Sequence, residues 1–517
     1  MEAIKKTLKD SAALRWTVLV LISGLMLSTY WFQDFYGGLK GLMESELGFS
    51  SEQFGRIIGL TTIANMFGMI IIGGIILDKW GVRLAGLLFG GIAVLGGLIS
   101  ALATAGTFGS DQSTMMTAMI IGRILFGSGL EVVCVVVNRT IVKWFKGYEL
   151  ALAMAISMGF GRLGSAMGLA LSVDIGGGSV APAVTFAATL IGIALIMFLV
   201  YVVFDIKLDR QLKEKKSASD DEFKFSDLLK LISNSSFLYI ALLCVTFYAA
   251  VFPFIQYAPD MLINKFNFTS ELAPEGNIMM FGSATLGNAS VFVLFFLFAI
   301  GFSVIPSRIA KKQNRRLFIG IVFIAFLAYL YSINEQLALW FKNGQKTASL
   351  IPVGTILFTP IFGNFVDKKG KAASLMILGS LLLIFAHISL SLFNSVYLAY
   401  AGLLSLGVAF SLVPAAMWPS VAKIVPESRL GTAYASMFTI QNWGLGLFFW
   451  GIGALLDYVN RSNIDEIRAG AANYDYTIPI LILVGCGIIS IFLAYKLKTA
   501  DKRQGYGLEL PSGAKAE

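Results

Sequence analysis

Histidine and cysteine are scarce in this chain, which has one histidine and three cysteines in 517 residues. The cysteines lie far apart in apolar segments, without a CxxC pair or metal-site spacing, so we expect neither a disulfide framework nor a zinc site. With His387 as the only histidine, a Ser/His/Asp or Cys/His catalytic set is implausible. A GxxxxGKS/T phosphate loop is also missing. These absences argue against an enzyme, an ATP-driven pump and a bound cofactor.

Charge is the second shortage. Charged residues make up 14% of the chain, whereas a soluble domain carries about a quarter. Hydrophobic residues make up 56% and the mean hydropathy is +0.76, with long apolar runs at 18–27, 66–77, 188–203 and 478–494. Runs near 20 residues can cross a hydrocarbon core. The chain is therefore a membrane protein. Its net charge of +9 reflects cations gathered in loops on one side, so we expect no nucleic-acid partner.

The hydropathy pattern predicts fourteen spans with the N-terminus inside. In that orientation the inward loops are rich in Lys and Arg, and the outward loops carry acids with few cations, which satisfies the positive-inside rule. The loop at 457–475 is mixed and indicates neither side. The predicted limits are 16–38, 54–77, 84–105, 113–140, 149–172, 182–204, 236–258, 288–306, 316–333, 347–366, 372–392, 394–418, 428–455 and 476–497.

A charged, serine-rich stretch at 206–235 is predicted to be a cytoplasmic linker, with an amphipathic helix at Phe223–Ile232 on the membrane surface. It divides the chain into two halves. The predicted units are a cytoplasmic tail at 1–15, an N-terminal bundle at 16–205, the linker, a C-terminal bundle at 236–497 with an inserted helix pair at about 286–345, and a cytoplasmic tail at 498–517.

A short repeat supports this division. Gly74-Ile-Ile-Leu-Asp78-Lys-Trp-Gly81-Val-Arg83 follows the second span, and Gly363-Asn-Phe-Val-Asp367-Lys-Lys-Gly370-Lys371 recurs in the second half with the same Gly-to-Asp and Asp-to-Gly spacings. Related halves with one motif after corresponding spans are typical of duplicated transporter folds. The motif resembles the signature of the major facilitator superfamily. This resemblance implies an all-α polytopic membrane protein with two pseudo-symmetric six-helix bundles, here with two extra transmembrane helices.

Acids at inner helix ends can pair with cations or with the N-terminus of a neighbouring helix, for example near Pro426–Arg429. We therefore predict that Asp78 and Asp367 hold an inward gate shut rather than contact a solute. The predicted gating and conformational set is Asp78, Arg83, Asp367, Lys371, Gly74, Gly363 and Arg123.

Two charged residues inside the spans are the strongest candidates for a binding site, because a charge at the bilayer centre costs at least ~2.5–3.5 kcal/mol. Glu131 and Arg162 lie about equally far from the turn between the fourth and fifth spans. At ~1.5 Å per residue both sit roughly 22 Å along antiparallel helices, nearly level. A buried salt bridge that only fixes packing is one interpretation. The other is that the acid takes an ammonium group and the guanidinium a carboxylate, as in binding a zwitterion.

Longer stretches of the sequence resemble one group of transporters within the superfamily. They are Gly122–Glu131, Val137-Asn138, Trp144–Leu150, Gly161–Ser165, Val251–Phe254, Met417–Ala422, Pro426–Tyr434 and Ile440–Asn442. They are similar to the lysosomal dipeptide uniporters of the superfamily and their prokaryotic relatives, over most of the chain outside 260–346. The resemblance implies that Glu131 and Arg162 hold the termini of a peptide, and that an accessory membrane protein is a conceivable partner.

The remaining candidates are polar groups expected near that site. Asn138, Tyr248 and Gln441 are predicted wall residues. Tyr30 and Asp34 either line the outer mouth or belong to an interfacial aromatic belt. His387 is either a ligand with a counterpart in the family or a satisfied core histidine.

The leading prediction is a carrier of dipeptides or similar small zwitterions that works by alternating access, as a uniporter, in contact with membrane lipid. Proton coupling is left open, with Glu131 or Asp34 as the proton site. One alternative is a proton-coupled exporter of organic cations or drugs, which would need Glu131 but not Arg162. Another is a non-transporting membrane subunit or receptor. We expect the inner membrane of a bacterium rather than the lysosomal membrane.

Overall fold

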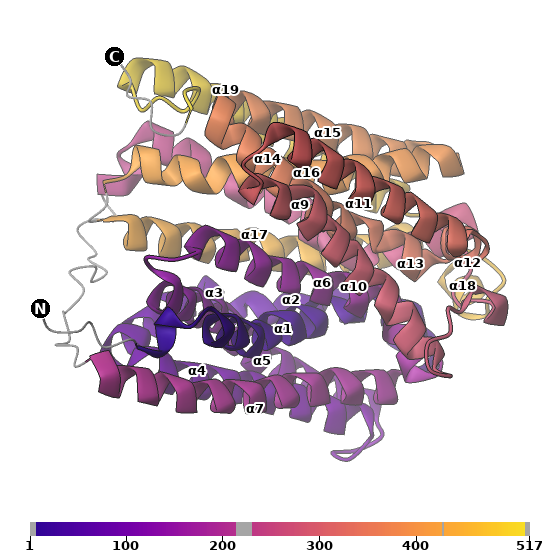
Figure 1. Cartoon of the computed structure of the whole chain (residues 1–517). Coiled ribbons are helices and arrows are strands. Elements are labelled where there is room, and N and C mark those ends of the chain that lie inside the picture. The colour runs from indigo at the N-terminus through magenta and orange to yellow at the C-terminus, as the bar shows by residue number, and fades with distance from the viewer. Residues whose placement is uncertain (1–6, 213–229, 427–428, 512–517) are drawn as a thin grey trace, which may run out of the picture.

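The computed structural model describes residues 7–212, 230–426 and 429–511, and the regular secondary structure of these residues is helical throughout. Two isolated bridges pair Thr269 with Asn343 and Met280 with Ser283. Figure 1 shows the N-terminal half of the chain as the lower layer of helices and the C-terminal half as the upper layer. The predicted all-α fold is confirmed for the described residues.

The N-terminal half contains η1 (Leu8–Asp10), α1 (Ala12–Leu47), α2 (Ser51–Gly59), η2 (Leu60–Thr62), α3 (Ile63–Met66), α4 (Met69–Thr104), α5 (Gln112–Phe145), α6 (Leu150–Gly176) and α7 (Val180–Leu212). The C-terminal half contains α9 (Ser235–Phe266), η3 (Pro274–Gly276), α10 (Ala284–Ser303), η4 (Ile305–Arg308), α11 (Lys312–Ser332), α12 (Asn334–Trp340), α13 (Gly344–Ala348), α14 (Leu350–Lys369), α15 (Ala372–Leu392), α16 (Val396–Ile424), α17 (Leu430–Val459), α18 (Ile464–Arg468) and α19 (Thr477–Gln504).

Among the described residues, 12 helices are long and apolar enough to cross a membrane. Two features separate this number from the predicted fourteen. The predicted spans 54–77 and 84–105 share α4, and α17, which covers the predicted span 428–455, carries the polar pair Gln441–Asn442 near its centre and is not among the 12. The exact count of fourteen therefore stays a prediction.

The chain turns sharply inside α4 at Gly81, whose φ of 76° lies in the left-handed region. After this turn the chain runs back along α5, so that Gly96 packs directly on the backbone of Gly122. Gly370 holds the corresponding position of the second repeat, with a φ of 70°. Glycine adopts such angles without steric cost. The repeat therefore marks equivalent turns in the two halves.

Several helices extend beyond the predicted limits. The first span is predicted to end at residue 38, but α1 continues through Gly37, Gly38 and Gly41 to Leu47, with α9 packed on Gly37 and α6 on Gly38, and Gly48 caps it with a φ of 70°. The predicted linker begins at 206, but α7 continues to Leu212, held by the pairing of Asp209 with Arg83. Most of the predicted surface helix at Phe223–Ile232 lies outside the described residues.

The two halves are sealed against each other at one end, which is the outer end in the predicted orientation. Glycines allow α2 and α17 to approach closely there, because a Cβ on Gly453 would lie 2.1 Å from the backbone oxygen of Ser51. Asp457 accepts hydrogen bonds from the backbone amides of Ser51 and Glu52 at 3.2 and 2.7 Å. Close backbone approach and a capped helix end together hold this seam shut.

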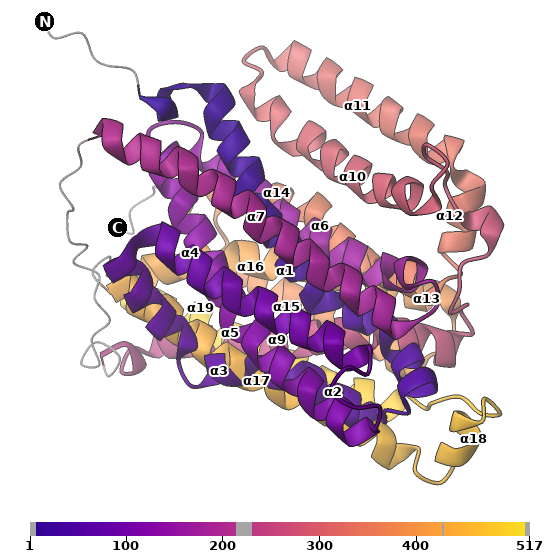
Figure 2. The ribbon, with the colours of Figure 1, turned by 90° about the horizontal axis from the view of Figure 1, so that it is seen from below.

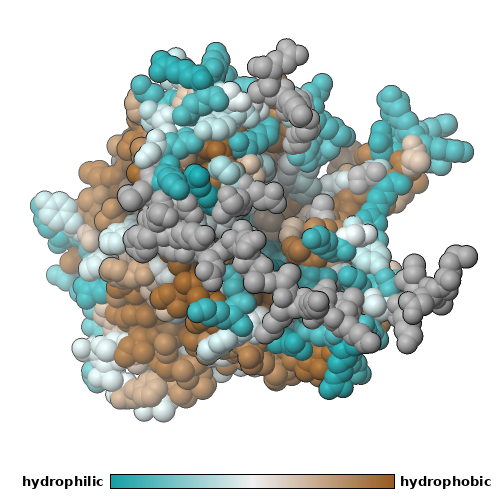
Figure 3. Space-filling view, turned by 90° about the vertical axis from the view of Figure 1, so that its left-hand side faces the viewer, coloured by the Kyte–Doolittle hydropathy of each residue, from teal (hydrophilic) through white to brown (hydrophobic). Residues whose placement is uncertain are grey.

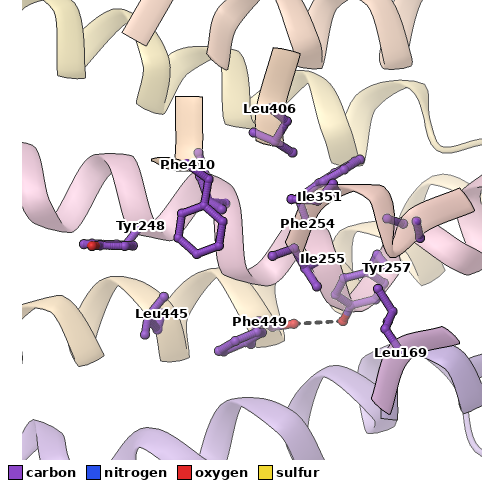
Figure 4. Packing of buried hydrophobic residues seen from close by; sticks show 14 of the residues in the cluster. Leu169, Tyr248, Phe254, Ile255, Tyr257, Ile351, Leu406, Phe410, Leu445 and Phe449 are labelled. Atoms are coloured by element: carbon purple, nitrogen blue, oxygen red, sulfur yellow. Dashed lines mark hydrogen bonds between the residues drawn. The ribbon is translucent and has the colours of Figure 1, made fainter. Parts of the chain in front are cut away.

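The packing beside this seam is aromatic. Tyr257 of α9 is fully buried and donates a hydrogen bond of 2.8 Å to the backbone oxygen of Phe449 in α17. Figure 4 shows this bond, with Ile255 and Leu169 on either side of it. The hydroxyl thus keeps its hydrogen bond while the ring fills the seam.

The inserted pair α10 and α11 stands to one side of both layers (Figure 2). Helix α10 packs against α6 of the first half and α14 of the second, whereas α11 packs mainly on α10. No residue of α11 is buried.

Candidate functional site

A cavity of about 230 Å³ lies between the halves, near the middle of their helices. The N-terminal half supplies most of its polar wall and the C-terminal half most of its aromatic wall. Six of the eight predicted binding residues line it, namely Tyr30, Glu131, Asn138, Arg162, Tyr248 and Gln441, together with Gln33, Asn65, Phe252, Trp418, Phe438 and Asn442 among others.

Glu131 and Arg162 face this cavity from α5 and α6. Both side chains are partly buried. The ion pairs of the described residues do not include one between them. The guanidinium of Arg162 lies instead over aromatic rings, 4.4 Å from the ring centre of Phe410 and 5.9 Å from that of Tyr30. The interpretation of this pair as a salt bridge that only fixes helix packing is therefore not supported by the geometry.

Small residues let α6 pack closely on α1 behind Arg162. A Cβ on Gly164 would lie 2.1 Å from the backbone oxygen of Leu27, and one on Gly161 would lie 3.1 Å from the ring of Tyr30. The small residues around Arg162 thus admit the neighbouring helix α1. This close crossing brings Tyr30 beside Arg162 on the cavity wall.

The opposite wall is a set of connected aromatic rings. Trp418 donates from Nε1 to the hydroxyl of Tyr248 at 3.0 Å and stacks on Phe438 at 4.9 Å between ring centres. Tyr248 stacks in turn on Phe252 at 5.5 Å. These contacts fix the ring planes, so the wall presents a preformed apolar surface.

Asp34 is buried outside the cavity lining and joins three helices. Its Oδ2 accepts a hydrogen bond of 2.5 Å from Ser165 of α6, and its Oδ1 accepts one of 2.9 Å from Gln256 of α9. The side chain therefore connects the two halves rather than facing the cavity. Gln256 also donates to the backbone oxygen of Gln33 at 3.3 Å, and Gln33 does line the cavity.

His387 and Arg123 are likewise buried away from the cavity. His387 lies in the C-terminal half, with Nδ1 2.9 Å from the oxygen of Leu383 and its ring against Phe254. Arg123 is fully buried and donates to the backbone oxygen of Phe32 at 2.9 Å. His387 therefore lies in the core, although its buried Nε2 has no hydrogen-bond partner among the described residues, while Arg123 braces α1 against α5.

Except for Arg123, the predicted gating residues lie at the inner end. Asp78 pairs with Arg139 of its own half at 2.9 Å, and Arg83 pairs with Asp209 at 2.7 Å. Lys371 adopts a φ of 61° at the start of α15, where its amide donates to the backbone oxygen of Glu509. A Cβ on Gly74 or Gly363 would meet nothing within 4 Å. Asp367 lies exposed at the end of α14, and residues 427–428, near its predicted partner, lie outside the described part.

Sequence reasoning missed the charged residues that close the outer end. Lys40 of α1 is fully buried between Glu44 and Asp260, at 2.7 and 2.9 Å. Lys346 of α13 donates to the backbone oxygen of Ala170 at 2.7 Å and to the carboxylate of Asp174. The signal that could have revealed both is a lone lysine beside an apolar span, where an unpaired cation is costly.

A tyrosine loop covers the Lys40 cluster. The hydroxyl of Tyr476 donates to Asp260, and that of Tyr474 donates to Glu44 at 3.3 Å. Burial, with the Glu44 carboxylate nearby, raises the pKa of Tyr474 to about 12. Tyr474 therefore remains a neutral hydrogen-bond donor to this cluster at physiological pH.

A mid-helix cavity walled by two helical halves that meet at one end is the arrangement of a membrane carrier. A family model described as Major Facilitator Superfamily matches residues 19–343, and the chain belongs to this superfamily. Solved transporters share the fold. The partially occluded inward open xylose transporter XylE from E. coli aligns with a TM-score of 0.60 at 12% identity, over 94% of this chain and 98% of that one. A bacterial homolog of the human lysosomal transporter Spinster, inward-facing and unoccupied, gives 0.60 at 13% identity, over 98% and 100%.

Curated relatives are more similar in sequence. The lysosomal dipeptide transporter MFSD1 of Danio rerio is 25% identical over 452 residues, covering 85% of this chain and 80% of the relative. The human MFSD1 is 24% identical over 455 residues, covering 86% and 80%. Relatives and folds alike are transporters and not enzymes, so the chain is a multi-pass membrane transporter.

Proposed function

We propose that this protein carries dipeptides or similar small zwitterionic solutes across the membrane by alternating access. The observation that supports this most is that Glu131 and Arg162 line one mid-membrane cavity without pairing with each other. An acid and a base held apart in a low-dielectric site are complementary to the two ends of a zwitterion. The names of the curated relatives point to the same substrate class.

Each wall has a role in this proposal. Glu131 binds the amino terminus, and Arg162 binds the carboxylate through its planar fork. Asn138, Gln441 and Tyr30 hydrogen-bond the peptide unit, and the aromatic wall around Tyr248 packs on the side chains of the solute. The cavity of about 230 Å³ is smaller than the ~300–1,000 Å³ of sites for drug-sized ligands, which suits a small solute.

We further propose that units 16–205 and 236–497 rock against each other, with 206–235 as their linker. The cross-half contacts at Lys40, Lys346 and Asp457 keep the outer end closed in the present state. Asp34, through Gln256, couples the outer seam to the cavity wall. When the inner end closes, it is held shut by contacts of the inner residues Asp78, Arg83, Asp367 and Lys371.

Uniport is the proposed mode, because one acid and one base in the site balance a neutral zwitterion without a co-transported ion. We propose the bacterial inner membrane as the location. The chain is expected to transport alone, whereas a receptor or subunit would need an accessory membrane protein for any uptake.

Uptake of labelled dipeptide into proteoliposomes that contain only this chain tests the proposal. We expect Glu131→Gln and Arg162→Ala each to lower uptake at least about ten-fold, since a charge-assisted hydrogen bond contributes about 1.5–3 kcal/mol. The exposed pair Glu466→Gln and Arg468→Ala in α18 is the matched control. Wild-type uptake by both cavity variants would refute the binding roles. The exporter alternative would be established by transport of organic cations that needs Glu131 but not Arg162 and whose rate increases with a proton gradient across the membrane.

A further inference from the structure

The hairpin formed by α10 and α11 has no role in the binding cavity, yet it touches both halves of the transporter. The ring of Phe296 in α10 lies against Gly159 of α6 and 5.4 Å from the ring of Phe160. Aromatic rings also join α10 to α11, as in the contact of Phe298 with Phe326 at 4.8 Å. The outer flank of α11 is left facing the membrane, since none of its residues is buried.

The inner tip of this hairpin is a concentrated basic patch. No Asp or Glu occurs between residues 276 and 334. The patch, hereafter the basic tip, consists of the exposed residues Arg308, Lys311, Lys312, Arg315 and Arg316. In Figure 3, which views the inner end, the hairpin projects on the right and its tip is hydrophilic.

Within the described part of the chain, few acids neutralise the basic tip. Arg308 approaches Glu149 at 4.0 Å, and the other four cations have no ion pair among the described residues. Some cations at the inner ends of other helices are paired, such as Arg139 with Asp78 and Lys498 with Glu509, whereas the basic tip gathers its five cations within residues 308–316 with no Asp or Glu among them. The positive-inside rule alone requires cations on this side but does not require them to be unpaired.

We propose that the basic tip is a binding site for the headgroups of anionic phospholipids in the inner leaflet. The apolar flank of α11 lies beside the acyl chains of the same lipids, and the start of α11 at Lys312 adds the positive end of a helix dipole. Guanidinium groups bind phosphate oxygens in a bidentate manner, and clustered cations next to a span attract anionic lipid. The proposal does not depend on the identity of the transported solute.

Thermal unfolding of the purified full chain with added lipid tests this proposal. Phosphatidylglycerol is compared with phosphatidylcholine of the same chains, at low and high salt. Because the lipid binds the folded state, phosphatidylglycerol is expected to raise the Tm of the wild type by on the order of 3 °C more than phosphatidylcholine does. High salt should reduce this difference by screening. Glycerol 1-phosphate should not reproduce it, because it has no acyl chains.

Two variants separate the basic tip from general charge. The tip variant carries Lys311→Gln, Lys312→Gln, Arg315→Gln and Arg316→Gln. The control removes four cations from the inner face of the main body by Lys368→Gln, Lys369→Gln, Lys502→Gln and Arg503→Gln. We expect the tip variant to lose most of the phosphatidylglycerol increment and the control to keep it.

Native mass spectrometry provides a readout that does not rely on unfolding. We expect fewer phosphatidylglycerol molecules to be retained by the tip variant than by the control. A charge-preserving variant with Lys311→Arg and Lys312→Arg should behave as the wild type. An equal lipid increment and equal lipid retention in the tip and control variants would overturn the proposal.

Discussion

Lys40 of α1 and Asp260 of α9 form an ion pair between the two halves, with 2.9 Å between Nζ and Oδ2 and the lysine side chain fully buried. Glu44 lies 2.7 Å from the same ammonium group. One cation thus holds two carboxylates together at the outer end. Because the two partners belong to different halves, the proposed alternating access requires this contact to break when the outer end opens.

Removing the shared cation is therefore expected to open the outer end. In Lys40→Met, the carboxylates of Glu44 and Asp260 are left facing each other, and a broken buried pair costs about 3–5 kcal/mol. A cysteine introduced at the fully buried position Met43 should then react with a membrane-impermeant thiol reagent several-fold faster. Lys342→Met, at an exposed position near the same end, is the control. Equal labelling in the two backgrounds would contradict a latch at Lys40.

The two termini of a dipeptide are predicted to depend on different residues. Wild-type transport should prefer a free dipeptide over its N-acetylated and its C-amidated forms. Glu131→Gln should lower the ratio of free to N-acetylated dipeptide uptake about ten-fold or more, since a lost charge-assisted hydrogen bond is worth about 1.5–3 kcal/mol. The same variant should keep the wild-type ratio of free to C-amidated dipeptide uptake. Arg162→Gln should do the reverse. Competition uptake measures both preferences, and parallel loss of both in each variant would contradict the assignment.

The aromatic wall is predicted to select solute side chains. Trp418→Ala removes the ring stacked on Phe438 and the donor to Tyr248. An aromatic contact contributes about 0.5–1.5 kcal/mol beyond its area, so the KM for dipeptides with aromatic side chains should rise about two- to ten-fold more than the KM for glycylglycine. Trp80→Ala, at an exposed position outside the cavity, should change neither. A uniform rise for both substrates would point to general loss of packing.

Glycine at the outer seam is predicted to be needed for closure. A Cβ on Gly453 would lie 2.1 Å from the backbone oxygen of Ser51, whereas one on Gly451 would meet nothing within 4 Å. Gly453→Ala should hold α2 and α17 apart and slow uptake strongly. Gly451→Ala should be tolerated or stabilise α17 by up to about 1 kcal/mol, because alanine favours helix more than glycine. Uptake rates and Tm values of the two variants compare them directly, and equal uptake would show that the seam adapts.

Much of the central cavity could be predicted because it depends on local rules. Glu131 and Arg162 flank one short turn, so a fixed rise per residue places them at the same depth. The structure brings both to the wall of one cavity. Asp34 and His387 could not be assigned in this way, because whether a polar side chain faces a cavity or a neighbouring helix depends on packing between distant spans.

The pairing of Lys40 at the outer end could not be assigned from the sequence, for two physical reasons. Lys40 lies past the predicted end of its span, because α1 continues to Leu47 through Gly37 and Gly38, against which other helices pack. Its partner Asp260 is 220 residues away in sequence. Pairing over such a distance is decided by how two helical halves dock, and no local pattern encodes that docking.

The sequence by itself determined that this chain crosses a membrane repeatedly, that its halves share a turn motif, and that an acid and a base lie at mid-depth. Long apolar runs and charge asymmetry are enough to predict these features. Apolar side chains are stable in the bilayer, and a helix forms all its backbone hydrogen bonds within itself. Only the tertiary structure decided which end is closed, that Glu131 and Arg162 stay unpaired, and that the inserted helices stand aside with an exposed basic tip. These properties depend on contacts between helices, and such contacts are set by the complementarity of whole surfaces.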